Sequence, residues 1–321
     1  MARILIVTPA RAGARNGNRH TAQRWAGFLR ALGHRVSVVV EWDGEPCDLL
    51  LALHARRSHA SVAAYRKQFP DKPLVVTLTG TDLYRDLPAS REARESLRLA
   101  DRVIVLQEDA LRLLDPRTRR KARVVYQSAR PLVRHSPPRK PFRIAVVGHL
   151  REEKDPFRAV AAFSHLDEIS IDLELIQIGD ALSPEMAAQA RHWMKQDPRY
   201  RWLGGRTHAQ ALRWIARSHL LVVSSVMEGG ANVIAEAARI GTPVLASCVS
   251  GNVGMLGRAY PGYFPLFNER ALCRLFEKNM NEKISYQKLK RALAARQNLF
   301  APAAERAALA RVLREALGRK A

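Results

Sequence analysis

The sequence is poor in cysteine and has no long apolar run. Its three cysteines, Cys47, Cys248 and Cys273, form no CxxC pair and have no histidines at metal-ligand spacing. We therefore expect reduced thiols and no metal site. No apolar stretch approaches the roughly 20 residues that a membrane-spanning helix needs, and the N-terminal segment lacks a cleavage site of small residues. These features predict a cytoplasmic protein without integral membrane association.

Acidic residues are scarce relative to basic ones. The 53 Lys and Arg outnumber the 30 Asp and Glu, which gives a formal net charge of +23. Such a charge suits nucleic acid, an anionic membrane surface or small phosphorylated substrates. The basic residues are spread along the whole chain, and no aromatic RNA-binding signature accompanies them. We therefore expect no nucleic-acid partner. A basic nucleic-acid-binding protein on an inactive scaffold and a membrane-surface role are kept as alternatives.

The length of 321 residues and the hydrophobic fraction of 47% are typical of two packed domains. Short apolar runs alternate with amphipathic stretches, which predicts parallel sheets covered by helices on both faces. Strands are predicted at 3–8, 35–41, 48–54, 74–79, 102–106, 123–126, 143–148, 172–178, 200–203, 220–224 and 243–246. Helices are predicted at 21–32 and 302–317 and from near Pro156, Pro184, His208 and Gly230.

Four prolines and a basic cluster in residues 130–141 predict a linker between the two domains, because neither a helix nor a central strand continues through them. We therefore expect a first domain at 1–135 and a second at 142–300. Residues 301–321 are expected to form a C-terminal helix that packs back across the junction. Trp193, Trp202 and Trp214 are assigned to core packing.

The most informative segment lies in the second domain. A predicted strand ends in Ser224 and Ser225, Glu228 follows, and a predicted helix then opens at a pair of glycines. Ligands of open α/β sheets bind at this carboxyl edge of the strands. Free N–H groups at the helix start predict an anion site suited to a diphosphate. These groups belong to Gly229, Gly230, Ala231 and Asn232.

Two glutamates accompany that anion site. Glu236 lies about two turns into the predicted helix, where its carboxylate can accept hydrogen bonds from a ribose diol. Glu228 is expected to face a donor sugar. For either glutamate taken alone, an ordinary role is the better explanation: Glu236 as a residue of an amphipathic helix and Glu228 as a capping residue. The double glycine and the exit Gly241-Thr242-Pro243 favour the ligand site.

Glu228 and Glu236, with seven residues between them and Gly241-Thr242-Pro243-Val244 after them, resemble the signature of family 4-type retaining glycosyltransferases. Residues 146–154 and 178–180 resemble two further turns of that family. The resemblance implies an α/β GT-B fold, in which two Rossmann-like domains turn their parallel sheets toward each other across a cleft that holds the active site. It implies catalytic roles for Glu228 and Lys154.

The resemblance also implies how the donor diphosphate is bound. In the family, a lysine at the position of Lys154 and an arginine contact it, but His149 stands at the arginine position here, and Arg151 is the alternative cation. The sequence has no Asp-x-Asp motif, so we expect neither a metal nor a cofactor. Charge on the departing diphosphate would be met by cationic side chains and N–H groups.

Segments of the first domain, at 8–10, 16–18, 21–26, 53–58, 78–86, 105–107 and 126–128, resemble the selenosugar synthases of selenoneine biosynthesis. This resemblance implies transfer of a sugar, expected to be N-acetylglucosamine, from a UDP-sugar to selenophosphate. A carbon–selenium bond would form and UDP would leave. The alternative is a conventional family 4 enzyme that glycosylates a hydroxyl of an envelope lipid or a small metabolite.

Several residues of the first domain fit such substrates. Asn16, Gly17 and Asn18 follow the first strand, where they could bind donor oxygens or form a simple turn. Thr79 replaces a histidine that is common in the family, which predicts altered substrate contacts. The remaining candidates for acceptor binding are Thr81, Arg56, Arg57 and Arg85.

Proton transfer has two candidates in this domain, His54 and Asp82, although a structural role explains His54 equally well. A selenium nucleophile ionises easily, so it needs less help from a base than a hydroxyl does. The absence of an obvious general base in the sequence is therefore compatible with the selenium reaction.

Overall fold

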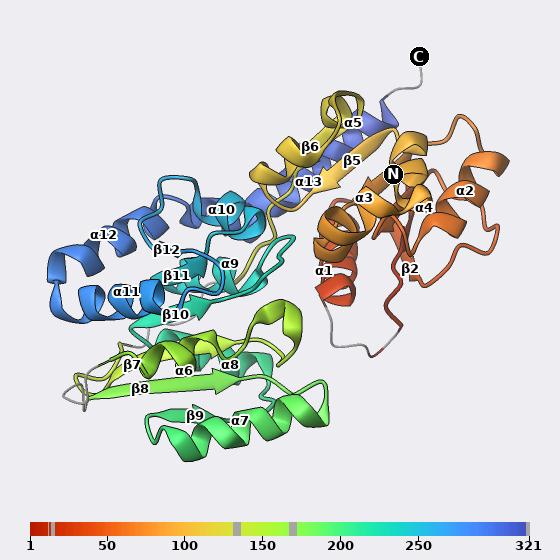
Figure 1. Ribbon diagram of the computed structural model, residues 1–321. Helices are drawn as coiled ribbons and strands as arrows, with labels where there is room; N and C mark the ends of the chain where they lie inside the picture. Colours follow the sequence, from red (N-terminus) through yellow and green to blue (C-terminus); the bar gives the residue numbers. More distant parts are fainter. Residues whose placement is uncertain (12, 14–16, 131–135, 167–171, 319–321) are drawn as a thin grey trace. The chain divides into compact units, whose positions relative to one another are not determined.

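The computed structural model describes residues 1–11, 13, 17–130, 136–166 and 172–318. The chain divides into two compact units, Met1–Gln127 with Pro302–Ala321, and Ser128–Ala301 (Figure 1). Each unit contains one six-stranded sheet, and every strand pair in both sheets is parallel. Among the described residues, no helix combines the length and the apolar character needed to cross a membrane.

The sheet of the first unit has the strand order β2-β1-β3-β4-β5-β6. Its strands are β1 Arg3–Val7, β2 Arg35–Val39, β3 Leu49–Leu53, β4 Leu74–Thr77, β5 Arg102–Val105 and β6 Ala122–Val124. The helical elements are α1 Gly17–Ala31, α2 His59–Gln68, η1 Asp82–Asp86, α3 Leu87–Ala89, α4 Arg91–Leu99, η2 Glu108–Leu113, α5 Pro116–Lys121 and α13 Pro302–Leu317. The chain runs from β1 to β2 on one side and then returns to β3 on the other.

Both faces of this sheet are buried, as the continuous apolar character of its strands requires. Ile4 and Ile6 of β1 pack into one core cluster with Trp25 of α1, whereas Leu5 and Val7 pack into a second cluster on the opposite face. The alternation follows from the two-residue period of a strand. Helices therefore have to cover both faces.

The sheet of the second unit has the order β12-β11-β10-β7-β8-β9. Its strands are β7 Phe142–Val147, β8 Leu173–Ile178, β9 Tyr200–Trp202, β10 Leu220–Val223, β11 Val244–Ser247 and β12 Tyr263–Phe264. The helical elements are η3 Glu152–Lys154, α6 Arg158–Phe163, α7 Pro184–Gln196, α8 His208–Ala216, α9 Asn232–Ile240, α10 Ser250–Leu256, α11 Glu269–Asn281, α12 Lys283–Ala294 and η4 Gln297–Phe300. The order reverses between β7 and β10, which makes that point the topological switch of the unit.

The predicted fold class, α/β with two parallel sheets, is confirmed, and each predicted strand lies within two residues of its expected ends. Strand β12 was not predicted, because its two residues are too few to show a period. Helix α1 begins at Gly17, four residues before the expected start at Thr21, whose hydroxyl donates to the Gly17 carbonyl at 2.8 Å.

The predicted core positions of the three tryptophans are correct only in part. Trp214 packs beside a small core cluster. Trp202 is half-buried, and its indole nitrogen donates to the Gly179 carbonyl at 2.9 Å. Trp193 is also half-buried. Trp25, which lies within the helix predicted at 21–32, is fully buried.

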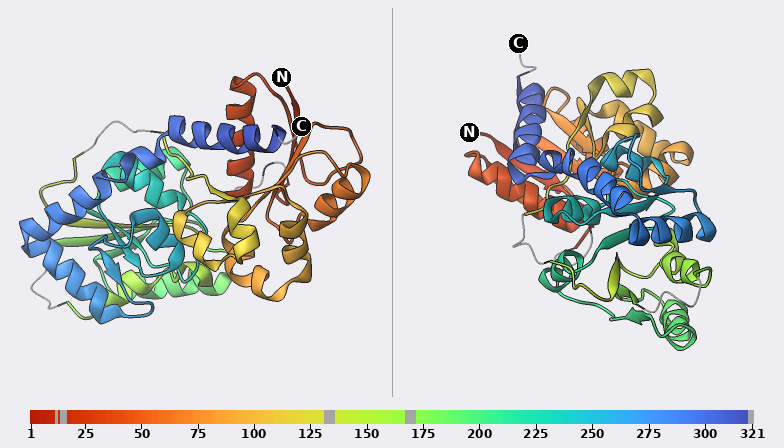
Figure 2. Two further views of the ribbon diagram at one scale, coloured as in Figure 1. Left: turned by 90° about the horizontal axis from the view of Figure 1, so that it is seen from above. Right: turned by 90° about the vertical axis from the view of Figure 1, so that its left-hand side faces the viewer.

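Helix α13 belongs to the first unit although it lies at the end of the chain (Figure 2). Its Glu305 is 1% exposed and accepts a hydrogen bond of 2.7 Å from the Trp25 indole nitrogen. The same carboxylate pairs with Arg24, whose Nε lies 2.9 Å from Oε2. A buried carboxylate is tolerated only when it is paired in this way, so this contact fixes α13 against α1.

Replacing Glu305 with alanine should lower the free energy of unfolding of the first unit by about 3 kcal/mol, because Arg24 and the Trp25 indole would lose a buried partner. Denaturant unfolding followed by tryptophan fluorescence measures this change. Arg306→Ala, at the exposed next position of α13, is the control and should change stability by less than about 0.5 kcal/mol. A loss below about 1 kcal/mol for Glu305→Ala would show that the pair does not hold the helix.

Candidate functional site

Two loops meet at the switch point of the second sheet. One follows β7 and carries Lys154 in the short turn η3, and the other follows β10 and carries Glu228. The Val226 N–H donates to the Glu153 carbonyl at 3.0 Å, and the Ser224 hydroxyl donates to the Asp155 carbonyl at 2.7 Å. These bonds hold the two loops in register at the carboxyl edge of the sheet.

Glu228 is the buried carboxylate at this edge, with 8% of its surface exposed. The Ser225 hydroxyl donates to its Oε1 at 2.6 Å, and the Lys154 ammonium forms an ion pair with the same oxygen. Within the described part of the chain, both protein donors thus bind Oε1, and Oε2 keeps its capacity to accept hydrogen bonds from a ligand. The structure therefore brings together Lys154 and Glu228, which the sequence resemblance assigned to catalysis.

A narrow hollow of about 20 Å³ adjoins this pair. Several residues that line it come from the loops after β7 and β10 and from the first turn of α9. They include Gly148, His149, Lys154, Ser224, Ser225, Glu228 and Val233, and residues of β7, β8 and β10 complete the lining. The hollow therefore lies at the switch point, where open α/β sheets bind ligands.

Two buried polar residues that sequence analysis missed, Ser247 and Asn252, support the loop that carries Ser225 and Glu228. The Ser247 hydroxyl donates to the Ser225 carbonyl at 2.6 Å, and the Asn252 amide donates to both the carbonyl and the hydroxyl oxygens of Ser247 at 3.0 Å. A Cβ on Gly251 would lie 1.8 Å from the Glu228 carbonyl oxygen. Only glycine allows α10 to approach so closely, and that glycine was the one available sequence signal.

Helix α9 begins at Asn232 on the same edge, and no side chain caps its first turn among the described residues. Its N–H groups there carry the positive end of the helix dipole. Gly229, Gly230 and Ala231 form the connection from Glu228 to this helix start, which lies two residues after the predicted start near Gly230. The edge therefore combines a lysine, a carboxylate and a helix N-terminus.

Glu236 lies farther along α9 and is mostly buried, with 14% of its side chain exposed. The imidazole Nε2 of His208, the first residue of α8, lies 2.7 Å from its Oε1. Sequence analysis did not single out His208 as a contact of Glu236. The pair joins the helices that follow β9 and β10.

His149 and Arg151, the two alternative cations for binding the donor diphosphate, lie in different surroundings. His149 lines the hollow beside Lys154, and its Nδ1 lies 4.0 Å from the Asp180 carboxylate. Arg151 points its guanidinium toward Glu153, with 3.9 Å between Nε and Oε2. His149 is thus the candidate that the local geometry places next to Lys154.

In the first unit, the loop after β3 places a strained histidine at the switch point between β1 and β3. His54 is 1% exposed and has a φ of 74°, a left-handed value that is uncommon outside glycine. Its Nδ1 accepts the Arg57 N–H at 3.3 Å, so the ring proton must lie on Nε2, which is 3.2 Å from the Thr81 hydroxyl. Burial lowers the pKa of this imidazole, which keeps it neutral.

Asp82 lies next to His54 and is fully buried. It accepts hydrogen bonds from the Ala55 N–H at 2.8 Å, the Thr79 N–H at 2.6 Å and the Thr79 hydroxyl at 2.9 Å. Burial raises the pKa of its carboxyl group, and these hydrogen-bond donors oppose that shift. Thr79, Thr81, His54 and Asp82 therefore form one polar cluster, with Asp82 at the first position of the π-helical turn η1.

Two predicted acceptor residues join this cluster through Asp86. The Nε of Arg56 lies 2.9 Å from Asp86 Oδ2, and the Nε of Arg85 lies 3.5 Å from Oδ1. Both arginine side chains are nearly half exposed, whereas the Asp86 side chain is 7% exposed. Arg57 contributes its backbone N–H to His54.

The residues predicted after β1 are only partly placed. Asn16 lies outside the described residues. Gly17 and Asn18 form the first turn of α1 rather than the loop that the sequence suggested, because the helix extends back to them. The first turn of α1 nevertheless follows β1, the strand at the switch point of this sheet.

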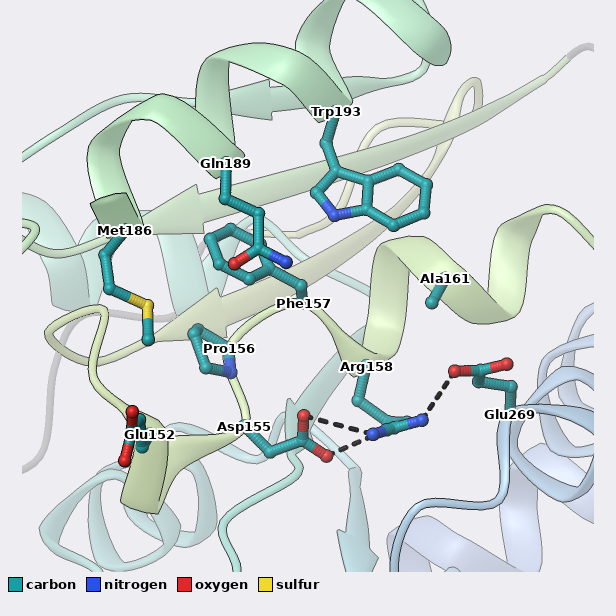
Figure 3. Close-up of a pocket in the computed structure, with 10 residues that line it drawn as sticks. All are labelled: Glu152, Asp155, Pro156, Phe157, Arg158, Ala161, Met186, Gln189, Trp193 and Glu269. Atoms are coloured by element: carbon teal, nitrogen blue, oxygen red, sulfur yellow. Dashed lines mark hydrogen bonds and ion pairs between the residues drawn. The ribbon is translucent and has the colours of Figure 1, made fainter. Parts of the chain in front are cut away.

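A separate groove of about 360 Å³ lies in the second unit beside α7 (Figure 3). Met186, Gln189 and Trp193 line one side of it, so the core assignment of Trp193 is wrong. Arg158 pairs there with Asp155 and Glu269, and it is the sole cation among the described lining residues. With that charge already neutralised, the groove is a poorer diphosphate site than the edge that carries Lys154.

Among the described residues, no three His, Cys, Asp or Glu side chains gather as a metal site would require.

Comparison with known proteins identifies the architecture. The family model described as glycosyl transferases group 1 matches residues 132–296. This range contains Lys154, Glu228 and Glu236.

Several solved structures share the whole architecture. HepE from Anabaena in complex with UDP-glucose is 15% identical, with a TM-score of 0.75, over 98% of this chain and 99% of that chain. Sucrose-phosphate synthase from Thermosynechococcus elongatus is 17% identical, with a TM-score of 0.78, over 97% and 98% of the two chains. A glycosyltransferase from Rickettsia africae is 14% identical, with a TM-score of 0.76, over 99% of both. At these identities the likeness establishes the GT-B fold.

The family match covers more than half of the chain and includes the lysine and the two glutamates at the sheet edge, so this protein belongs to the group 1 glycosyl transferases.

Proposed function

We propose that this protein transfers a sugar from a UDP-sugar and that the edge built by Lys154, Glu228 and α9 binds the donor. The observation that carries the proposal is the pairing of a buried carboxylate with a lysine at the switch point, beside a helix start without a side-chain cap. Two structures of the similar HepE contain UDP-glucose and UDP. A nucleoside diphosphate has the charge that this edge would bind.

The donor's leaving group sets the chemistry at this edge. As the bond between the anomeric carbon and the diphosphate oxygen breaks, its electron pair leaves with UDP, and negative charge accumulates there. Lys154 and the N–H groups at the start of α9 would stabilise this charge without a metal ion. His149, which lines the same hollow, would add a ring N–H donor. Arg151 would serve only after leaving Glu153.

Glu228 would bind the sugar rather than the diphosphate. Its Oε1 is occupied by Ser225 and Lys154, so Oε2 would accept hydrogen bonds from donor-sugar hydroxyls. The carboxylate would thereby link the position of the sugar to that of the lysine. Glu236 would accept the ribose hydroxyls of the same donor, as the family resemblance implies.

We propose selenophosphate as the acceptor, in a reaction that gives a selenosugar for selenoneine biosynthesis. The resemblance of the first-unit segments to selenosugar synthases is the main support. Arg56 and Arg85, held by Asp86, would bind the anionic phosphoryl group. A selenium lone pair would form the bond to the anomeric carbon as UDP departs, and water would later take the phosphoryl group.

The geometry of His54 favours such a nucleophile over a hydroxyl. Both ring nitrogens already have partners within the protein, Arg57 at Nδ1 and Thr81 at Nε2. The histidine is therefore badly placed to remove a proton from an acceptor alcohol, whereas a selenium anion needs no base. O-glycosylation of a lipid or metabolite hydroxyl is the second candidate and would need Asp82 or another group as the base.

Incubation with UDP-N-acetylglucosamine and selenophosphate should release UDP and give a product whose mass contains selenium and the sugar. Mass spectrometry with its selenium isotope pattern identifies this product, and an assay with a sugar alcohol in place of selenophosphate is the control. An O-linked product alone would overturn the selenium assignment. Failure to release UDP with any acceptor or sugar nucleotide would contradict the donor proposal as well.

The variant Glu228→Gln should lower kcat about 100-fold, because a neutral amide binds Lys154 and a sugar hydroxyl less strongly than a carboxylate does. The matched control is Glu152→Gln, which changes a glutamate of the adjacent turn that lines the groove of Figure 3. Steady-state kinetics should show less than a twofold change for the control. Equal activity of both variants would remove Glu228 from the site.

A further inference from the structure

The contact between His208 and Glu236 joins two helices at the edge that we assign to the donor. His208 Nε2 lies 2.7 Å from Glu236 Oε1. His208 is the first residue of α8 and its side chain is 72% exposed, whereas the Glu236 side chain is only 14% exposed. A carboxylate accepts hydrogen bonds only, so Nε2 carries the proton and donates it.

The position of His208 is fixed by its own helix start. Thr207 forms a capping box with Gln210: the Thr207 hydroxyl accepts the Gln210 N–H at 3.3 Å, and the Gln210 carbonyl oxygen Oε1 accepts the Thr207 N–H at 3.0 Å. This box holds the first turn of α8 without help from Glu236. Buried Ala211 and Ile215 anchor the rest of the helix. The contact is therefore not needed to keep α8 in place.

The contact instead restricts the conformation of the Glu236 side chain. A glutamate side chain has several rotamers, and a ligand that must select one of them loses binding free energy. A charge-assisted hydrogen bond from a preformed helix start selects that rotamer in advance. One lone pair of Oε1 is used, and Oε2 is left to accept hydrogen bonds from neighbouring hydroxyls.

Resting on the proposed function, we infer that His208 is a positioning residue for the nucleotide: it holds Glu236 toward the ribose and thereby makes the site prefer a ribonucleotide to its 2′-deoxy analogue. The ligand class is a uridine nucleotide with an intact ribose diol. The inference concerns recognition and assigns His208 no part in bond breaking.

The experiment measures the Kd of UDP and of 2′-deoxy-UDP by calorimetry, using the full chain and its variants. His208→Ala should weaken UDP binding about fivefold to tenfold and 2′-deoxy-UDP binding by a clearly smaller factor, because 2′-deoxy-UDP offers Glu236 only one of the two ribose hydroxyls. His208→Gln, whose amide nitrogen can take the place of Nε2, should restore most of the UDP affinity. His192→Ala, at an exposed position of α7, is the control and should change neither value.

The outcomes separate the inference from the function on which it rests. If the unaltered protein binds no UDP, the donor proposal itself fails. If it binds UDP and His208→Ala binds UDP equally well or more tightly, His208 does not position Glu236. An equal loss for UDP and 2′-deoxy-UDP would overturn the inference too, since a general disturbance of the helix start would not distinguish the two ligands.

Discussion

The Glu228 carboxylate is stable in its buried position because two loops supply its partners. Removing a carboxylate from water is costly unless hydrogen bonds and an opposite charge replace the water. Lys154 comes from the loop after β7 and Ser225 from the loop after β10. The two loops meet because β10 pairs with β7 after the chain has crossed the sheet. The doubly wound strand order thus makes this ion pair possible.

Residues of β11 and α10 also support the ion pair between Glu228 and Lys154. Ser247, the last residue of β11, donates to the Ser225 carbonyl, and Asn252 of α10 donates to Ser247. Gly251, the second residue of α10, lies against the Glu228 carbonyl. The first unit builds a comparable polar cluster after β3, around His54 and Asp82, with different chemistry. There the histidine is neutral and strained, and the exposed cations belong to Arg56 and Arg85.

The strands and the motif residues were predictable because their signals are local. A strand shows its apolar run, and Glu228, the glycines after it and Glu236 fall within one short segment. The contacts of Ser247, Asn252 and His208 were not predictable, because each joins residues on different elements, and periodicity carries no information about such pairs. The early start of α1 was missed because Gly17 and Asn18 are poor helix formers in isolation.

Hydrogen exchange with and without saturating UDP tests the placement of the donor site most directly. Because bound ligand suppresses local opening, the account predicts slower exchange of the amides in residues 148–156 and 229–236, around Lys154 and the start of α9. Protection confined to other segments, such as the α7 side of the groove in Figure 3, with these two ranges unchanged, would contradict it.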